Sequence, residues 1–137
     1  KVILRNPNAT RPWQHVLEAL SGYLRLAYMI EKDKKLNGQS FNFSNNSIRN
    51  FTVLDFIKGI NKYWKNANWI INKKNSFHES TLLQLNSRKA KKILNWKNKL
   101  KLKDTIKMVG EWYYTYYSSN KKKILTENQI INYMKKK

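Results

Sequence analysis

The sequence predicts a mainly helical α+β fold with a few short strands, formed as one domain or a piece of one. Its longer segments repeat apolar residues at helical spacing, whereas its strand-like runs are only a few residues long. A chain of 137 residues can bury one modest core. The chain begins without Met, directly in a strand-like run, which suggests that it has been cut from something longer.

The composition excludes several classes of site. With no cysteine, the chain has no disulfide framework, cysteine nucleophile or thiolate metal site, and two histidines cannot build a zinc centre alone. No apolar run approaches the ~20 residues of a membrane span. We therefore expect no metal and no membrane partner, and a cytoplasmic location.

The net charge of +20 would usually point to a nucleic acid or an anionic membrane. Lysine dominates the 28 basic residues, however, and Asn, Ile and Tyr are plentiful, as expected for an AT-rich genome. A protein selected for phosphate contact would more often keep arginine. We interpret the charge as a drifted surface, and a small basic nucleic-acid-binding module remains the alternative function.

In the first third of the chain, two strands should flank one helix. Residues 1–5 have the apolar centre of a short buried strand. A helix is expected from Val16 to Glu31, ending before Asn37-Gly38. Residues 39–44 alternate around two phenylalanines and predict a strand. The apolar stripe that should face inward on the helix comprises Val16, Leu20, Leu24, Ala27, Met29 and Ile30.

The middle of the chain predicts one helix and two further strands. The helix should run from Thr52 to about Lys65, and Thr52 and Asp55 are spaced as a capping box. Strands are expected at residues 69–71 and 81–85, separated by a polar loop over residues 72–80.

The last third should be helical. A short basic helix is expected at residues 87–94, followed by a long helix that carries Trp112, Tyr113 and Tyr116. These aromatic residues could stack on single-stranded nucleic acid, but their helical spacing favours packing in the core. Thr126 to Gln129 reads as a capping box that opens a terminal helix. Its residues Ile130, Ile131 and Met134 should share one side.

The stretch with the most chemistry is the loop at residues 5–15. Pro7 and Pro12 fix their own φ and push Asn6 and Arg11 towards extended geometry, so a stiff loop should join the first strand to the first helix. A guanidinium held just before a proline is suited to bind a diphosphate or carboxylate through two parallel hydrogen bonds. The alternative is a surface arginine over the ring of Trp13.

Residues 5–18 read Arg-Asn-Pro-Asn-Ala-Thr-Arg-Pro-Trp-Gln-His-Val-Leu-Glu, followed at residues 20–24 by Leu-Ser-Gly-Tyr-Leu. This run closely resembles the C-terminal half of CDP-glucose 4,6-dehydratases, members of the extended short-chain dehydrogenase/reductase superfamily. Three later motifs follow one another as in the last part of that superfamily, which this region also resembles. They are Ser-Arg-Lys-Ala at residues 87–90, Leu-Asn-Trp at 94–96 and Glu-Trp-Tyr at 111–113.

The resemblance implies an α/β superfamily in which residues 1–120 form the nucleotide-sugar-binding lobe, without the Rossmann half, and residues 121–137 form a basic tail with a short helix. The full enzyme would use NAD to convert CDP-glucose to CDP-4-keto-6-deoxyglucose for surface polysaccharide. We expect the isolated chain to be inactive, because catalytic groups and NAD belong to the missing N-terminal half. Helix faces normally covered by that half should be exposed.

Two departures from the family pattern are mild. The middle residue of Leu-x-Trp is usually glycine in the family, and Asn95 is the next-best residue for a positive φ at a helix end. Lys101 stands where the family tends to place a serine cap, so the long helix should begin less stably by about 1 kcal/mol.

The resemblance also implies site residues. Arg11 matches the arginine of the Arg-x-x-x-His/Tyr-Val signature, which contacts the diphosphate. Arg5 and Asn6 are expected near the base and ribose, although a purely structural role is also open. His15 matches the signature's His or Tyr, and the favoured interpretation is a buried imidazole that is bonded to backbone and orients the Arg11 loop.

His78 and Glu79 are expected as secondary substrate contacts, from the resemblance to a family His-Glu pair that borders the substrate pocket. They should not share one proton, because adjacent residues on an extended segment point to opposite faces. Tyr28 and Lys32 have the Tyr-x-x-x-Lys spacing of this superfamily's catalysis, but that spacing is common by chance here, and the catalytic pair is expected upstream.

The glycines give no sign of a dinucleotide site. The four glycines are scattered along the chain, so they form no Gly-x-x-Gly-x-x-Gly loop. We therefore assign no catalytic, cofactor-binding or metal-binding residue to this chain.

Overall fold

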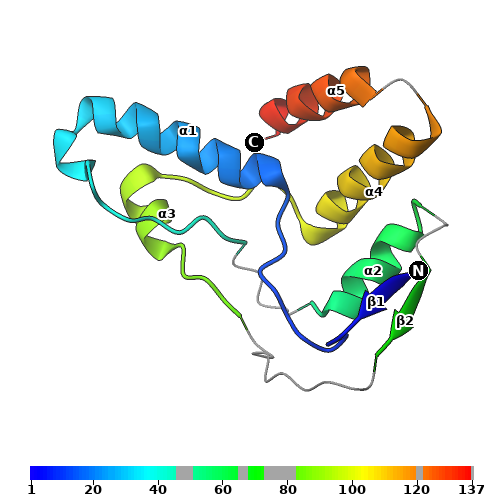
Figure 1. Ribbon diagram of the computed structural model, residues 1–137. Coiled ribbons are helices and arrows are strands. Elements are labelled where there is room, and N and C mark those ends of the chain that lie inside the picture. The colour runs from blue at the N-terminus through cyan, green and yellow to red at the C-terminus, as the bar shows by residue number, and fades with distance from the viewer. Residues whose placement is uncertain (46–50, 65–67, 73–82, 120–121, 137) are drawn as a thin grey trace.

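The structure is a computed structural model that describes residues 1–45, 51–64, 68–72, 83–119 and 122–136 (Figure 1). Within these ranges it is mainly helical with one small sheet, as predicted. The elements in chain order are β1 (Val2–Leu4), α1 (Val16–Lys32), the 3-10 turn η1 (Lys34–Leu36), α2 (Val53–Asn61), β2 (Trp69–Ile71), α3 (Arg88–Leu94), α4 (Leu102–Ser118) and α5 (Lys122–Lys135).

The helices pack in pairs. In Figure 1, α4 lies between α2 and α5, while α3 lies beside α1 at the other end of the molecule. Strands β1 and β2 form a parallel pair in which Val2 lies opposite Trp69 and Leu4 opposite Ile71. Of the β1 residues only Leu4 is buried, so the expectation of a buried strand over residues 1–5 was wrong for the rest of the strand.

The main core lies between α1 and α3. Leu36, Phe43, Leu94 and Trp96 are buried there, and the Phe43 ring meets the edge of Trp96 at 5.1 Å between centroids. Gly22 of α1 lies directly against Phe43, because a Cβ at this position would collide with the ring. The core therefore needs a glycine on the inner side of α1.

Helix α1 has the predicted extent, but its inner face was predicted wrongly. Val16, Leu20, Leu24 and Ala27 are exposed, whereas Glu18 and Gly22 are buried. Met29 and Ile30, also predicted to face inward, do pack against the core. The helix is turned so that Glu18 and Gly22, rather than Leu20 and Leu24, face the rest of the protein.

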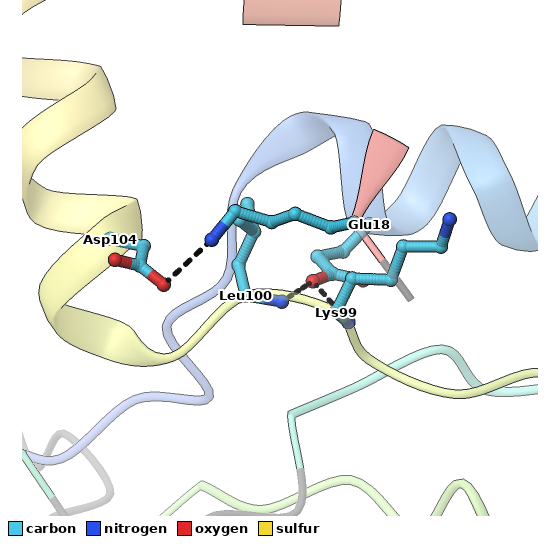
Figure 2. Close-up of polar contacts among 5 residues, drawn as sticks. Glu18, Lys99, Leu100 and Asp104 are labelled. Carbon is cyan, nitrogen blue, oxygen red and sulfur yellow. Dashed lines mark hydrogen bonds and ion pairs between the residues drawn. The ribbon is translucent and has the colours of Figure 1, made fainter. Parts of the chain in front are cut away.

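The buried Glu18 carboxylate explains this orientation. Its Oε1 accepts hydrogen bonds from the backbone N–H groups of Lys99 at 2.9 Å and Leu100 at 2.6 Å (Figure 2). Its Oε2 accepts the hydroxyl hydrogen bond of Tyr133 at 3.0 Å. A single side chain that is 1% exposed thus joins α1, the segment before α4, and α5. A buried carboxylate needs such donors, because ions without partners are very costly to bury.

Ser21, one turn after Glu18, extends the same network. Its hydroxyl donates to the backbone carbonyl of Glu18 at 2.7 Å and accepts from the indole Nε1 of Trp96 at 3.0 Å. The Tyr133 hydroxyl also lies 2.9 Å from it. Polar groups in α1 are therefore satisfied by residues far along the chain.

Helix α5 differs from its prediction at both its start and its buried face. It begins at Lys122, so Thr126 is inside the helix and is not a cap; its Oγ1 instead accepts a hydrogen bond from Trp112 Nε1 at 2.8 Å. The buried residues are Gln129 and Tyr133. The predicted apolar side, Ile130, Ile131 and Met134, is exposed. Specific hydrogen bonds to α1 and α4 outweigh the apolar pattern here.

The strand predicted at residues 39–44 does not form. The strand predicted at residues 81–85 is also absent over residues 83–85, and residues 81–82 lie outside the described residues. In residues 39–44, side chains rather than a neighbouring strand donate hydrogen bonds to two backbone carbonyls. Gln14 Nε2 donates to the Phe43 carbonyl at 2.9 Å, and Ser87 Oγ donates to the Ser44 carbonyl at 3.2 Å. Alternation alone had indicated a sheet.

The aromatic residues of α4 pack on one another at the surface. Trp64 stacks on Tyr113 at 6.0 Å and on Tyr117 at 5.3 Å between ring centroids. Trp112 stacks on Tyr116 at 5.0 Å. Tyr113 and Tyr116 remain exposed, so the expectation that they lie in the core was wrong, while Trp112 is half-buried.

Several local predictions are confirmed. The capping box is complete, with the Asp55 N–H bonded to Thr52 Oγ1 at 3.0 Å and the Thr52 N–H to Asp55 Oδ2 at 3.1 Å, although α2 ends at Asn61 rather than near residue 65. Asn95 has φ of 51° at the end of α3. Lys101 precedes α4 without a side-chain cap.

We expect Lys101→Ser to stabilise the protein by about 1 kcal/mol, because a serine at this extended position can accept a hydrogen bond from the first turn of α4. The free energy of unfolding in urea measures this gain. Lys97→Ser, which removes an equal charge from an exposed linker position, is the control and should have little effect. Equal free energies for both variants would contradict the capping argument.

We expect Tyr133→Phe to cost about 1–2 kcal/mol at pH 7, because it removes the hydroxyl that binds the Glu18 carboxylate. Tyr114→Phe, on an exposed hydroxyl, should change nothing.

The difference in unfolding free energy between wild type and Tyr133→Phe should depend on pH. Burial raises the pKa of Tyr133 to about 12 from its ordinary 10, so the folded state holds the phenol proton more tightly than the unfolded chain does. The corresponding stability is complete below pH 10 and is lost as the pH rises towards 12. The gap between wild type and Tyr133→Phe should narrow over that range, and a constant gap would show that Tyr133 is not the group responsible.

Candidate functional site

The loop at residues 5–15 is a connection between β1 and α1, as predicted, and the start of α2 holds its backbone. The Val53 N–H donates to the Ala9 carbonyl at 2.9 Å, and the Leu54 N–H donates to the Pro7 carbonyl at 3.0 Å. These N–H groups belong to the first turn of α2 and have no partner within the helix. The loop and the helix therefore satisfy each other.

Trp13 anchors the same loop through its side chain. Its indole Nε1 donates to the Phe51 carbonyl at 3.0 Å, and its ring stacks on Phe56 of α2 with centroids 4.1 Å apart. The Trp13 ring thus packs against α2 and holds this part of the loop in place.

The Arg11 guanidinium lies half-buried against its own loop. Its Nη1 donates to the Thr10 carbonyl at 2.8 Å. Asn6 is also half-buried and Arg5 is exposed, and the Asn6 carbonyl accepts a hydrogen bond from the Ala9 N–H at 3.3 Å. The structure brings Arg5, Asn6 and Arg11 into one loop. Their predicted contacts with a nucleotide stay predictions.

His15 caps the start of α1. The Leu17 N–H donates to His15 Nδ1 at 3.2 Å, and the imidazole is 6% exposed. This geometry matches the structural interpretation of His15, in which a buried imidazole is bonded to backbone. Burial lowers its pKa from the ordinary 6.5, because a charged imidazolium is poorly solvated there.

The other sequence candidates lie elsewhere. His78 and Glu79 fall outside the described residues. Tyr28 and Lys32 are exposed on α1, with Lys32 Nζ 4.5 Å from the centre of the Tyr28 ring. A hydrogen bond from Lys32 and its positive charge lower the pKa of Tyr28. The spacing thus produces a real pair, on a surface of α1 rather than in a cleft.

A shallow hollow of about 530 Å³ lies beside the start of α4 and was not predicted. It is lined by Asn45, Phe51, Asn98, Lys99, Leu100, Lys101, Leu102 and Lys103. The loop residues Arg5, Asn6, Arg11 and His15 are not among them. Three lysines make its wall positive, so its chemistry suits an anion better than a metal. The lysine-rich sequence near residue 100 was the available signal, and it was interpreted as ordinary surface.

Among the residues that the structure describes, no three His, Asp or Glu side chains gather as a metal site would require. Within the same ranges, none of the helices combines the length and the apolar character needed to cross a membrane.

We expect the stability of the protein to fall as the pH drops below about 6.5, because His15 is held neutral in the folded state and its lowered pKa favours folding only at higher pH. His15→Asn keeps a good helix cap and cannot ionise. It should therefore weaken the dependence of the unfolding free energy on pH between about 5.5 and 7. An unchanged dependence would assign the effect to another group.

Comparison with known proteins adds one relative and no family model, since none matches the chain. The chain is 32% identical over 136 residues to the CDP-glucose 4,6-dehydratase of Salmonella typhimurium (strain LT2). The matched region covers 98% of this chain and 38% of the relative, so the chain spans less than half of the relative's length. The resemblance predicted from the sequence is therefore confirmed: over nearly its whole length, the chain is similar to the C-terminal portion of a CDP-glucose 4,6-dehydratase.

Proposed function

We propose that this chain is the substrate-binding portion of an NAD-dependent CDP-glucose 4,6-dehydratase and supplies its grip on the nucleotide diphosphate. The observation that carries the proposal is the 32% identity to such an enzyme over 136 residues. The whole enzyme would belong to the extended short-chain dehydrogenase/reductase superfamily and act in the cytoplasm. Absence of cysteine is compatible with that compartment.

The loop geometry supports Arg11 as the residue that binds the diphosphate. Hydrogen bonds from Val53 and Leu54 fix the loop backbone, and Trp13 packs on α2. An arginine on such a backbone loses little backbone freedom when it binds, and a guanidinium can bind two phosphate oxygens at once. Arg5 and Asn6, on the same loop, would approach the base and ribose. His15 would keep the loop in place, and His78 and Glu79 would make secondary contacts.

The glycines support the proposal that NAD binds outside this chain. A dinucleotide cradle needs glycines where backbone approaches a pyrophosphate. Here Gly22 packs on Phe43, Gly59 on Ile106 and Gly110 on Tyr63, while Gly38 occupies a turn with φ of 76°. These residues do not fit NAD, so we propose that the chain alone has no dehydratase activity. Formation of product from CDP-glucose and NAD by the chain alone would contradict this.

One observation favours the second candidate, a small basic nucleic-acid-binding module. The rings of Tyr113 and Tyr117, which stack on Trp64, are exposed on a chain with net charge +20. Exposed aromatic rings among basic residues can stack on the bases of a single strand.

We expect the chain to bind CDP, and Arg11→Ala to weaken that binding at least tenfold, because the variant lacks the charge-assisted hydrogen bonds to the diphosphate. Isothermal titration of both proteins with CDP measures the change. Arg88→Ala, which removes an equal charge from an exposed position at the start of α3, should bind within twofold of wild type.

A mixed oligonucleotide titrated at two salt concentrations separates the two functions. Nucleic-acid binding falls steeply with salt, whereas a diphosphate site should prefer CDP at both concentrations. Strongly salt-dependent oligonucleotide binding without CDP binding would favour the nucleic-acid module. Equal losses of CDP affinity in Arg11→Ala and Arg88→Ala would show that Arg11 contributes only its positive charge and no specific contact.

A further inference from the structure

Helix α5 reaches α1 through the side chain of Tyr133. This residue is 6% exposed, and its hydroxyl lies 3.0 Å from Glu18 Oε2 and 2.9 Å from Ser21 Oγ, both on α1. An ionised carboxylate has no proton to give, so Tyr133 is the donor in the bond to Glu18. Burial raises the pKa of Tyr133 to about 12, so the phenol keeps this proton at neutral pH.

The two oxygens of the Glu18 carboxylate are held by different segments. Oε1 accepts hydrogen bonds from the backbone N–H groups of Lys99 and Leu100, which precede α4. Oε2 has one donor among the residues that the structure describes, the Tyr133 hydroxyl. Without that hydroxyl, Oε2 would be a buried acceptor without a partner, so the carboxylate would shift or admit water. Tyr133 therefore fixes the orientation of the carboxylate.

Glu18 lies in the first turn of α1, shortly after the loop that carries Arg11. Its own N–H donates to the His15 carbonyl at 3.0 Å, and the Leu17 N–H donates to His15 Nδ1 at 3.2 Å. Within the loop, the Trp13 N–H donates to the Arg11 carbonyl at 2.8 Å. Only a short stretch of hydrogen-bonded backbone thus separates Glu18 from Arg11, so a shift of the first turn of α1 is passed to the loop.

We propose that Tyr133 is a positioning residue for the candidate nucleotide site, because its bond to Glu18 keeps the first turn of α1, and hence the Arg11 loop, in place. This inference rests on the proposed function, in which Arg11 binds a nucleotide diphosphate. Tyr133 acts through Glu18 and does not touch the nucleotide. Because coupling between two sites is reciprocal, a diphosphate bound to Arg11 should in turn tighten the contact between α5 and α1.

Helix α5 also has contacts with α4 that bypass Glu18. Thr126 Oγ1 accepts a hydrogen bond from Trp112 Nε1 at 2.8 Å, and Gln129 Nε2 donates to the Met108 carbonyl at 2.8 Å. Loosening these contacts should weaken the attachment of α5 without removing a donor from Glu18. Thr126→Val, which replaces a hydroxyl with a methyl group, is therefore a matched control for Tyr133→Phe.

Amide hydrogen exchange of the 137-residue chain, followed by NMR, tests the coupling without any ligand. The reporters are the Leu17 N–H, which binds His15, and the N–H groups of Val53 and Leu54, which bind carbonyls of the loop. The exchange rate of each reporter is divided by that of the slowest amides in α4, which follow global unfolding.

We expect Tyr133→Phe to raise these ratios at least fivefold and Thr126→Val to leave them within twofold. If Tyr133→Phe speeds exchange equally throughout the chain, its hydroxyl has only a structural role and the proposal fails. The proposal also fails if Thr126→Val raises the ratios as much, because the attachment of α5 in general, rather than the bond to Glu18, would then hold the loop.

CDP binding supplies a second measurement, made by titration at a temperature at which circular dichroism shows every variant to be folded. Tyr133→Phe should bind CDP at least fivefold more weakly than wild type, and Thr126→Val within twofold. In an Arg11→Ala background, Tyr133→Phe should cost less than a further twofold, because a residue that acts through Arg11 then has nothing to position. Losses that simply multiply would overturn the proposal.

The reciprocal effect needs no variant. In the wild-type chain, saturating CDP should slow exchange of the Lys99 and Leu100 N–H groups, which bind Glu18, at least threefold. The Ser119 N–H, bonded to the Thr115 carbonyl at the far end of α4, is the control and should change less than twofold. CDP binding that leaves the Lys99 and Leu100 amides unchanged would contradict the coupling.

These results also separate this inference from the proposed function. A chain that does not bind CDP, but whose loop reporters exchange selectively faster in Tyr133→Phe, would retain the positioning role and reject the proposed grip on nucleotide. A chain that binds CDP equally well as wild type and as Tyr133→Phe would retain the grip and reject the positioning role.

Discussion

The buried carboxylate of Glu18 is the interaction on which the arrangement of this protein depends. It draws together α1, the backbone of Lys99 and Leu100, and Tyr133 of α5, which are separated by up to 115 residues in the sequence. Because a buried ion without donors is very unfavourable, the three segments must meet in this one register. The close contact between Gly22 and Phe43 holds α1 in the same rotation.

That constraint reaches the candidate site through α1. His15 caps the first turn of the helix, so the orientation set by Glu18 also determines where the preceding loop leaves it. Contacts between that loop and α2 then fix Trp13 and the Arg11 backbone. Helices α1 and α2 thus position the candidate site by fixing the loop backbone from which its side chains extend.

The same constraint explains why so much apolar surface faces solvent. With Glu18 and Gly22 turned inward, Leu20 and Leu24 must point outward. The exposed face is a consequence of internal hydrogen bonding, and it does not reflect weak packing of α1.

Local rules were sufficient for the features that depend on neighbouring residues: the span of α1, the capping box of Thr52 and Asp55, and the positive φ of Asn95. The loop ahead of α1 and the resemblance carried by Arg11 were likewise readable from the sequence. Only the tertiary structure decided which side of α1 is buried and whether residues 39–44 join a sheet. Those outcomes depend on distant donors, above all the partners of Glu18, and a pattern of apolar residues contains no information about where such donors will lie.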